Sequence, residues 1–245
     1  MVKLMVEVRL MGEEVITRIF LMIVVTFLFV ALIMPFIKKL AFHVGALDIP
    51  RTEEGHRHIH KDITPKSGGL AMFLGFVLSY MLFGESSQVM DSILIGGAIM
   101  VFTGFIDDIK PLPAVVQFVG QLVAASVVTF YGGILLQDVS AFNIYIDFGI
   151  LAYPITIFFI LGCINCMNFI DGLDGLSGGI SAIYYLTIGV IAAIMGSLGL
   201  DVTLTFIMFG ATLGFLVHNF HPATIFAGNS GSMFMGFMIA VIALL

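Results

Sequence analysis

The sequence predicts an all-α integral membrane protein, a polytopic bundle of about eight transmembrane helices in which residues 1–245 form one domain. Hydrophobic residues make up 60% of the chain and charged residues only 11%, whereas a soluble globular domain carries about 25% charged residues. Mean hydropathy is +1.12. The net charge of -6 argues against nucleic acid as a partner, because no basic face is available to neutralise phosphates.

Eight apolar stretches are candidates for the spans, since a bilayer core of about 30 Å needs about 20 mostly apolar residues per helix. The third stretch is short. Residues 1–15 mix charged and apolar side chains, so we expect an outer or interfacial segment there. The expected spans run over residues 17–37, 67–83, 92–106, 114–131, 149–167, 179–197, 201–218 and 230–245.

Lys and Arg residues set the expected orientation, because they stay on the cytoplasmic side of short loops. Six of them lie between the first and second spans, and Lys110 lies between the third and fourth. The loops at 84–91, 132–148 and 198–200 contain none. We therefore expect the loops after spans one, three, five and seven to be cytoplasmic and the N-terminus to be outside. Lys3, Arg9 and Arg18 oppose this orientation.

This alternation places the unusual polar groups of four loops on one side of the membrane. The most informative loop lies between the fifth and sixth spans, where Asn168, Asp171 and Asp174 occur among glycines. Two carboxylates and an amide on a glycine-rich turn suit Mg²⁺ or the hydroxyls and ring nitrogens of a nucleotide. The alternative is a loop whose Asp-Gly pairs only form turns.

Asp107 and Asp108 end the third span ahead of Lys110 and Pro111. Adjacent helical residues point about 100° apart, so one carboxylate can face a metal while the other faces elsewhere. Like charges this close raise the pKa of one member, which suits a general base or a metal ligand. The alternative is a pair of solvated acids that stop the helix.

The loop before the second span is basic. His56, His58 and His60 alternate there, but neighbouring cations favour an anion-binding or lipid-surface loop over a transition-metal site. Lys66, between a proline and two glycines, is a candidate phosphate contact.

A fourth polar segment covers residues 219–231 and ends with Gly228, Asn229, Ser230 and Gly231 just before the last apolar stretch. Free N–H groups and the positive dipole end of a helix favour anions such as phosphate at this position. The alternative is an ordinary Ser or Asn helix cap.

The four segments, in this order, resemble the polyprenyl-phosphate N-acetylhexosamine-1-phosphate transferases (glycosyltransferase 4 family), and the resemblance covers essentially the whole chain. Within that superfamily the chain is more similar to the WecA/TagO type, which uses UDP-GlcNAc, than to the MraY type, which uses UDP-MurNAc-pentapeptide. The motifs that carry the resemblance are residues 60–71, 104–108, 165–176 and 226–232.

The resemblance implies transfer of GlcNAc-1-phosphate from UDP-GlcNAc to undecaprenyl phosphate with release of UMP. This would be the first membrane step of envelope polysaccharide, lipopolysaccharide or teichoic acid synthesis, with the active site at the cytoplasmic face of the bacterial inner membrane. It also implies Mg²⁺ as the cofactor, with Mn²⁺ as a substitute, and allows a homodimer in the bilayer.

The resemblance further implies roles for individual residues. Asp107 would activate the lipid phosphate as a base, and Asp108 would help to position the lipid or the metal. The metal environment would be formed by Asn229, Asp107 and Asp171. The residues expected to bind the nucleotide sugar and its phosphates are Lys61, Lys66, Asn168, Asp171, Asp174, Asn219 and Phe226, with the Phe226 ring stacked on uracil.

The chain departs from the family pattern in two ways. Asn229 stands where the family has a metal-binding Asp, so we expect weak or absent turnover. The family has ten or eleven spans and a late His-rich cytoplasmic loop, whereas this sequence stops at Leu245 inside an apolar run, so we expect a C-terminally incomplete chain.

Three other functions remain open from sequence. One is the MraY type of transferase. Another is an ion-coupled membrane transporter, because intramembrane carboxylates often mark ion paths, although the acids here lie at helix ends. A third is a CDP-alcohol phosphotransferase, whose Asp-Gly-x-x-Ala-Arg pattern is absent because Ser177 and Gly178 follow Leu176.

Overall fold

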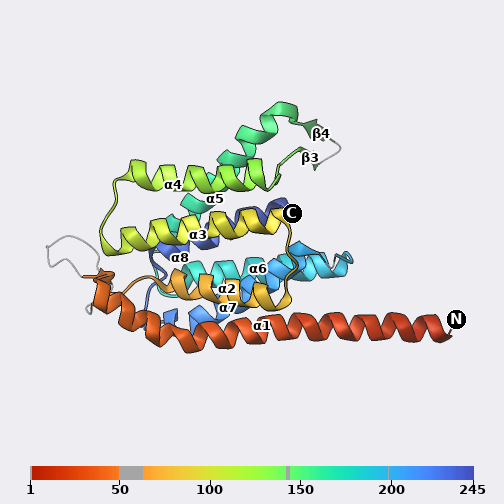
Figure 1. The fold of residues 1–245 in the computed structure, drawn as a ribbon, viewed down its shortest axis with the longest axis horizontal. Helices are drawn as coiled ribbons and strands as arrows, with labels where there is room; N and C mark the ends of the chain where they lie inside the picture. The colour runs from red at the N-terminus through yellow and green to blue at the C-terminus, as the bar shows by residue number, and fades with distance from the viewer. Residues whose placement is uncertain (1, 50–62, 142–143, 198) are drawn as a thin grey trace.

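The computed structural model describes residues 2–49, 63–141, 144–197 and 199–245. In this part of the chain eight α-helices lie side by side with roughly aligned axes (Figure 1). The helices are α1 (Val2–Val44), α2 (Gly68–Phe83), α3 (Gln88–Ile109), α4 (Ala114–Ser126), α5 (Ala152–Ile170), α6 (Leu176–Ile194), α7 (Leu200–Asn219) and α8 (Gly228–Leu244).

Each predicted span falls on one of these helices. Among the described residues, six helices, with short extensions of α4 and α5, are long and apolar enough to cross a membrane, and α2 and α8 are shorter apolar helices. The prediction of a polytopic helical membrane protein is confirmed.

Two of the predicted spans belong to longer helices. Helix α1 has 43 residues, or roughly 65 Å at 1.5 Å per residue, so the N-terminal segment expected to be outer or interfacial continues the first helix. The third helix is not short, because α3 has 22 residues. Apolarity marks only the part of a helix inside the bilayer, whereas α3 begins at a Ser87 cap that accepts from Met90 N at 3.1 Å and continues through Asp107 and Asp108.

Short elements complete the fold. Strand β1 (Leu47–Asp48) pairs with β2 (Thr64–Pro65), and β3 (Asp138–Ala141) forms an antiparallel hairpin with β4 (Ile144–Asp147) where a loop was expected. A π-helical turn, η1 (Val127–Tyr131), extends α4, and a 3₁₀ turn, η2 (Gly149–Leu151), precedes α5. The β3–β4 hairpin lies at the opposite end of the bundle from the C-terminal end of α1 (Figure 1).

Helices α7 and α8 occupy the middle of the bundle and are the most buried. Their buried residues occur on every side of each helix, as expected for helices surrounded by other helices. The α8 ring of Phe234 meets Phe73 and Phe76 of α2 edge to face, with ring centroids 5.5 and 5.8 Å apart. Such aromatic pairs fix the depth at which α8 lies against α2.

The first turn of α8 lies against the backbones of α2 and α3, because two glycines allow close approach. A methyl group added at Gly69 would clash with the backbone of Gly231, and one added at Gly104 would clash with the backbone of Ser230. The Gly69 N–H donates to Ala227 O at 3.2 Å. The start of α8 is therefore held at the meeting point of three helices.

We predict that Gly104→Ala lowers the Tm of the detergent-solubilised chain by an amount equivalent to about 1–3 kcal/mol, because the added methyl group overpacks the contact with α8. Gly162→Ala in α5 is the matched control, since its methyl group would meet nothing within 4 Å and alanine favours helix. Equal melting of the two variants would contradict the close approach.

Candidate active site

The four polar segments meet at one end of the bundle, around a cavity of about 500 Å³. The helices alternate in direction, so the ends of α1, α3, α5 and α7 share this end with the start of α8 (Figure 1). The convergence predicted from the sequence is confirmed. Nine of the predicted site residues line the cavity: Lys66, Asp107, Asp108, Asn168, Asp171, Asp174, Asn219, Phe226 and Asn229. The tenth, Lys61, lies outside the described residues, as do the three alternating histidines.

Asp108 caps the first turn of α8. Its Oδ1 accepts from the backbone N–H of Asn229 at 2.8 Å, and its Oδ2 accepts from the Ser230 hydroxyl at 2.9 Å and the Ser230 N–H at 3.3 Å. The Ser67 hydroxyl lies 3.4 Å from the same Oδ2. These N–H groups were expected to bind phosphate, but a carboxylate of the chain itself takes that place, because a buried acid is stabilised at a helix N-terminus.

Asp107, in contrast, is only partly buried and is bound by groups from three directions. Its Oδ1 accepts from Leu112 N at 2.6 Å and from the Gln117 side chain at 2.8 Å. Its Oδ2 accepts from Nδ2 of Asn229. Neither acid is a solvated helix terminator, so that alternative was wrong. Asp107 is the more accessible of the two for chemistry.

Asn229 bridges the last turn of α3 and the last turn of α5. Its Nδ2 donates to Asp107, and its Oδ1 accepts from Asn168 Nδ2 at 2.9 Å. Asn168 also donates to the Ser232 hydroxyl at 3.0 Å. Because a carboxylate only accepts, the nitrogen of Asn229 must face Asp107. An aspartate at this position would instead put two carboxylates against each other and would need a cation between them.

Asp171 is the C-cap of α5, and its Oδ1 accepts from the Ser177 hydroxyl at 2.6 Å. Burial raises the pKa of the Asp171 carboxyl above its ordinary value, while the Ser177 hydrogen bond and the charge of Lys66 act in the opposite direction. An oxygen ligand that is partly desolvated is well suited to a cation or to a donor group of a nucleotide.

Lys66 is the only cation among the described residues that line the cavity, beside five carboxylates. Its ammonium lies 3.0 Å from Asp48 Oδ1, across the β1–β2 pair. The sequence analysis missed Asp48, although a lone acid between apolar residues after the first span was a signal. The acids outnumber the cation, so an anionic ligand needs additional positive charge. The lining acids are Asp48, Asp107, Asp108, Asp171 and Asp174.

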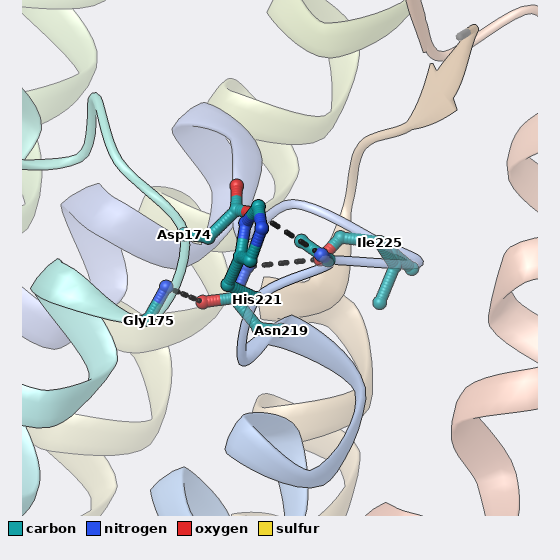
Figure 2. Close-up of polar contacts among 6 residues, drawn as sticks. Asp174, Gly175, Asn219, His221 and Ile225 are labelled. Atoms are coloured by element: carbon teal, nitrogen blue, oxygen red, sulfur yellow. Dashed lines mark hydrogen bonds and ion pairs between the residues drawn. The ribbon is translucent and has the colours of Figure 1, made fainter. Parts of the chain in front are cut away.

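Asn219 and Asp174 connect two loops (Figure 2). The Asn219 side chain is almost fully buried, accepting from Gly175 N at 3.0 Å and donating to Ile225 O at 3.0 Å. Asp174 Oδ2 accepts from Ala223 N at 3.0 Å. Both polar atoms of the Asn219 amide are bound to backbone, so the side chain fixes the wall of the cavity. Its expected contact with the nucleotide sugar stays a prediction.

Phe226 reaches the cavity from the same loop. Its N–H donates to Pro65 O at 2.9 Å, and its carbonyl accepts from Gly68 N at 3.0 Å. The backbone is thus held by the segment that carries Lys66. Stacking of the ring on a base stays a prediction.

Comparison with known proteins identifies the family of this site. The model of glycosyl transferase family 4 matches residues 90–245, which include the acid pair, the Asn168–Asp174 turn and Asn229. The chain belongs to glycosyl transferase family 4.

Relatives of two kinds are found within glycosyl transferase family 4. The chain is 38% identical over 239 residues to a probable undecaprenyl-phosphate N-acetylglucosaminyl 1-phosphate transferase of Bacillus subtilis, covering 96% of this chain and 65% of that protein. It is 36% identical over 223 residues to a decaprenyl-phosphate N-acetylglucosaminephosphotransferase of Mycobacterium tuberculosis, covering 83% and 54%. It is 33% identical over 240 residues to a phospho-N-acetylmuramoyl-pentapeptide-transferase of Halalkalibacterium halodurans, covering 91% and 72%. The chain thus spans roughly half to two thirds of the first two relatives.

The oxygen ligands at this family 4 site decide whether it suits Mg²⁺. The described residues contain no group of three or more His, Cys, Asp or Glu side chains that could hold a metal ion. The expected set of Asn229, Asp107 and Asp171 supplies two carboxylates and an amide. Mg²⁺ is commonly bound by one or two carboxylates together with substrate phosphates, so these residues fit the ion in the company of a diphosphate.

We predict that Asp108→Ala lowers Tm by the equivalent of about 1–3 kcal/mol, because it leaves buried N–H and O–H groups at the start of α8 without an acceptor. Asp108→Asn, which keeps one oxygen, should lose less. Asp138→Ala on the exposed hairpin is the control, and thermal unfolding in detergent is the measurement. An Asp108→Ala chain that melts with the parent would show that the cap adds no stability.

Proposed function

We propose that this chain carries the catalytic site of a polyprenyl-phosphate GlcNAc-1-phosphate transferase. An oxygen of undecaprenyl phosphate attacks the β-phosphorus of UDP-GlcNAc, the bond to the bridging oxygen breaks, and UMP leaves. The observation that carries the proposal is the convergence of acids, amides and a lysine from four separate segments on one cavity at the helix ends. Relatives named for this chemistry support it.

Phosphoryl transfer needs positioning and charge neutralisation more than covalent help. Asp107, accessible and fixed by Leu112 and Gln117, accepts the proton of the lipid phosphate. Asp108 binds the start of α8 and thereby keeps Asp107 close to residue 229. Lys66 supplies fixed positive charge near the phosphates. Bound Mg²⁺, held by Asp107 and Asp171 with the residue at 229, would neutralise the diphosphate and its leaving group.

The location of the cavity suits the two substrates. A lipid acceptor stays in the bilayer while a sugar nucleotide stays in water, so they meet only at the membrane surface. Lys38, Lys39, Lys66 and Lys110 all lie at the cavity end of the bundle, which supports a cytoplasmic position for this end in a bacterial cell membrane. The product would be the lipid-linked sugar that starts an envelope polysaccharide or teichoic acid.

The MraY-type reaction is the second candidate. This chain covers 72% of a relative of that kind, compared with 65% and 54% of the two GlcNAc-phosphate transferases. Its chemistry at the phosphates is the same, and the two differ in the sugar. An ion-coupled transporter is less well supported, since Asp107 and Asp108 lie in the last turn of α3 and Asp171 caps α5, at helix ends instead of mid-membrane.

We predict that Asn229→Asp raises turnover at least about tenfold, because a carboxylate at this position binds Mg²⁺ more strongly than the neutral amide oxygen of Asn229 does. Membranes containing each chain receive undecaprenyl phosphate, Mg²⁺ and either radiolabelled UDP-GlcNAc or labelled UDP-MurNAc-pentapeptide. Labelled lipid and released UMP are measured.

Asn229→Ala is the matched control, since it removes the same amide without adding a ligand, and it should stay as slow as the parent. Equal turnover of the parent and Asn229→Asp would show that the side chain at position 229 does not help to bind the metal. Label from the pentapeptide substrate alone would favour the MraY-type reaction. Solute flux into proteoliposomes without labelled lipid would favour a transporter.

A further inference from the structure

The cavity wall that carries Asp174, Asn219 and Phe226 is built from two segments. One is residues 171–175 between α5 and α6, and the other is residues 219–227, the last residue of α7 and the loop before α8. Three hydrogen bonds with side-chain partners join these two segments. One runs from Gly175 N to Asn219 Oδ1, and two converge on Asp174 Oδ2, from Ala223 N and from His221 Nδ1, each at 3.0 Å. Figure 2 shows Asp174, Gly175, Asn219 and His221 together.

Asn219 and His221, which both bind the 171–175 loop, differ in burial. Asn219 is 3% exposed, so it is a fixed part of the fold. The His221 side chain is 76% exposed, while that of Asp174 is 6% exposed. His221 therefore covers Asp174 from the solvent side and can be replaced without opening the core. Because a carboxylate only accepts, His221 Nδ1 carries the hydrogen.

We propose that His221 is a positioning residue that orients the Asp174 carboxylate and ties the two loops together for nucleotide binding. His221 contacts Asp174 and is not among the residues that line the cavity, so in this proposal it acts through Asp174. The inference rests on the proposed function and on the expectation that Asp174, which lines the cavity, binds the nucleotide. Without His221, Asp174 keeps the bond from Ala223 N but loses the bond from His221 Nδ1 to the same oxygen.

The chain offers a rescue variant and a control. Asn at position 221 places an amide N–H close to where Nδ1 lies, so His221→Asn should keep the bond to Asp174. His218 lies three residues earlier, in the last turn of α7, and its Nε2 contacts Ala31 O at 3.0 Å, away from the cavity. His218→Ala therefore removes a histidine contact of similar length without touching Asp174.

The first test measures UDP affinity by calorimetry in detergent with Mg²⁺ present. His221→Ala should bind UDP about two- to fivefold more weakly, in line with a single exposed charged hydrogen bond. His221→Asn should return to the parent affinity, and His218→Ala should leave the affinity unchanged. Unchanged affinity in His221→Ala, or failure of His221→Asn to restore it, would overturn the proposal.

Hydrogen exchange of the loop amides separates this inference from the proposed function. In His221→Ala the amide of Ala223 should exchange faster than in the parent, whereas His218→Ala should leave it unchanged. A parent chain that fails to bind UDP would contradict the proposed function, and the exchange rates would then decide the loop contact alone. Equal exchange in the parent and His221→Ala would overturn the contact between the loops.

Discussion

The carboxylate of Asp108 on the first turn of α8 is the interaction on which the site depends. It satisfies backbone N–H groups that a helix leaves unpaired at its start, and it does so at a point where Gly69 and Gly104 let α2 and α3 reach the α8 backbone. This contact fixes the distance between the end of α3 and the start of α8. Asp107 precedes Asp108 in the chain, and Asn229 is the residue whose N–H binds Asp108. The side chains of Asp107 and Asn229 are thereby brought into hydrogen-bond contact.

The second constraint is charge. Five carboxylates and one lysine line the described part of the cavity, and bringing a diphosphate into such a site is unfavourable unless cations accompany it. Three of the carboxylates have partners within the chain that partly offset their negative charge. The first turn of α8 binds Asp108, Lys66 binds Asp48, and the amide of Asn229 binds Asp107. The contact between Asp107 and Asn229 is the one that a metal-binding aspartate would have to replace.

The sequence predicted the eight helices and the common end of their polar loops because apolar length and the positions of Lys and Arg depend only on the bilayer. It identified Asp107, Asn168, Asp171 and Asn229 because polar side chains are rare in such a chain. It did not predict which group binds which. Whether the N–H groups of α8 receive a phosphate or Asp108 depends on helix packing, which the local sequence does not contain.

The same limit applies to Asn219, whose buried amide binds two backbone groups. It also applies to Asp48 at the end of β1, whose partner Lys66 directly follows β2. Long-range pairs of this kind follow from tertiary structure. The ends of α3 were missed for a related reason, since this helix continues beyond its apolar stretch into Asp107 and Asp108, which are bound by groups at the packed end of the bundle. The N-terminal part of α1 instead extends beyond the other helices (Figure 1).

The most direct measurement is the affinity of the purified chain for UDP-GlcNAc with Mg²⁺ and with EDTA in its place. If acids and amides of four segments form one nucleotide site, UDP-GlcNAc should bind in a 1:1 ratio and should bind at least about tenfold more tightly with Mg²⁺, because the cation offsets the excess of carboxylates. No binding under either condition, or equal affinity with EDTA, would contradict this account.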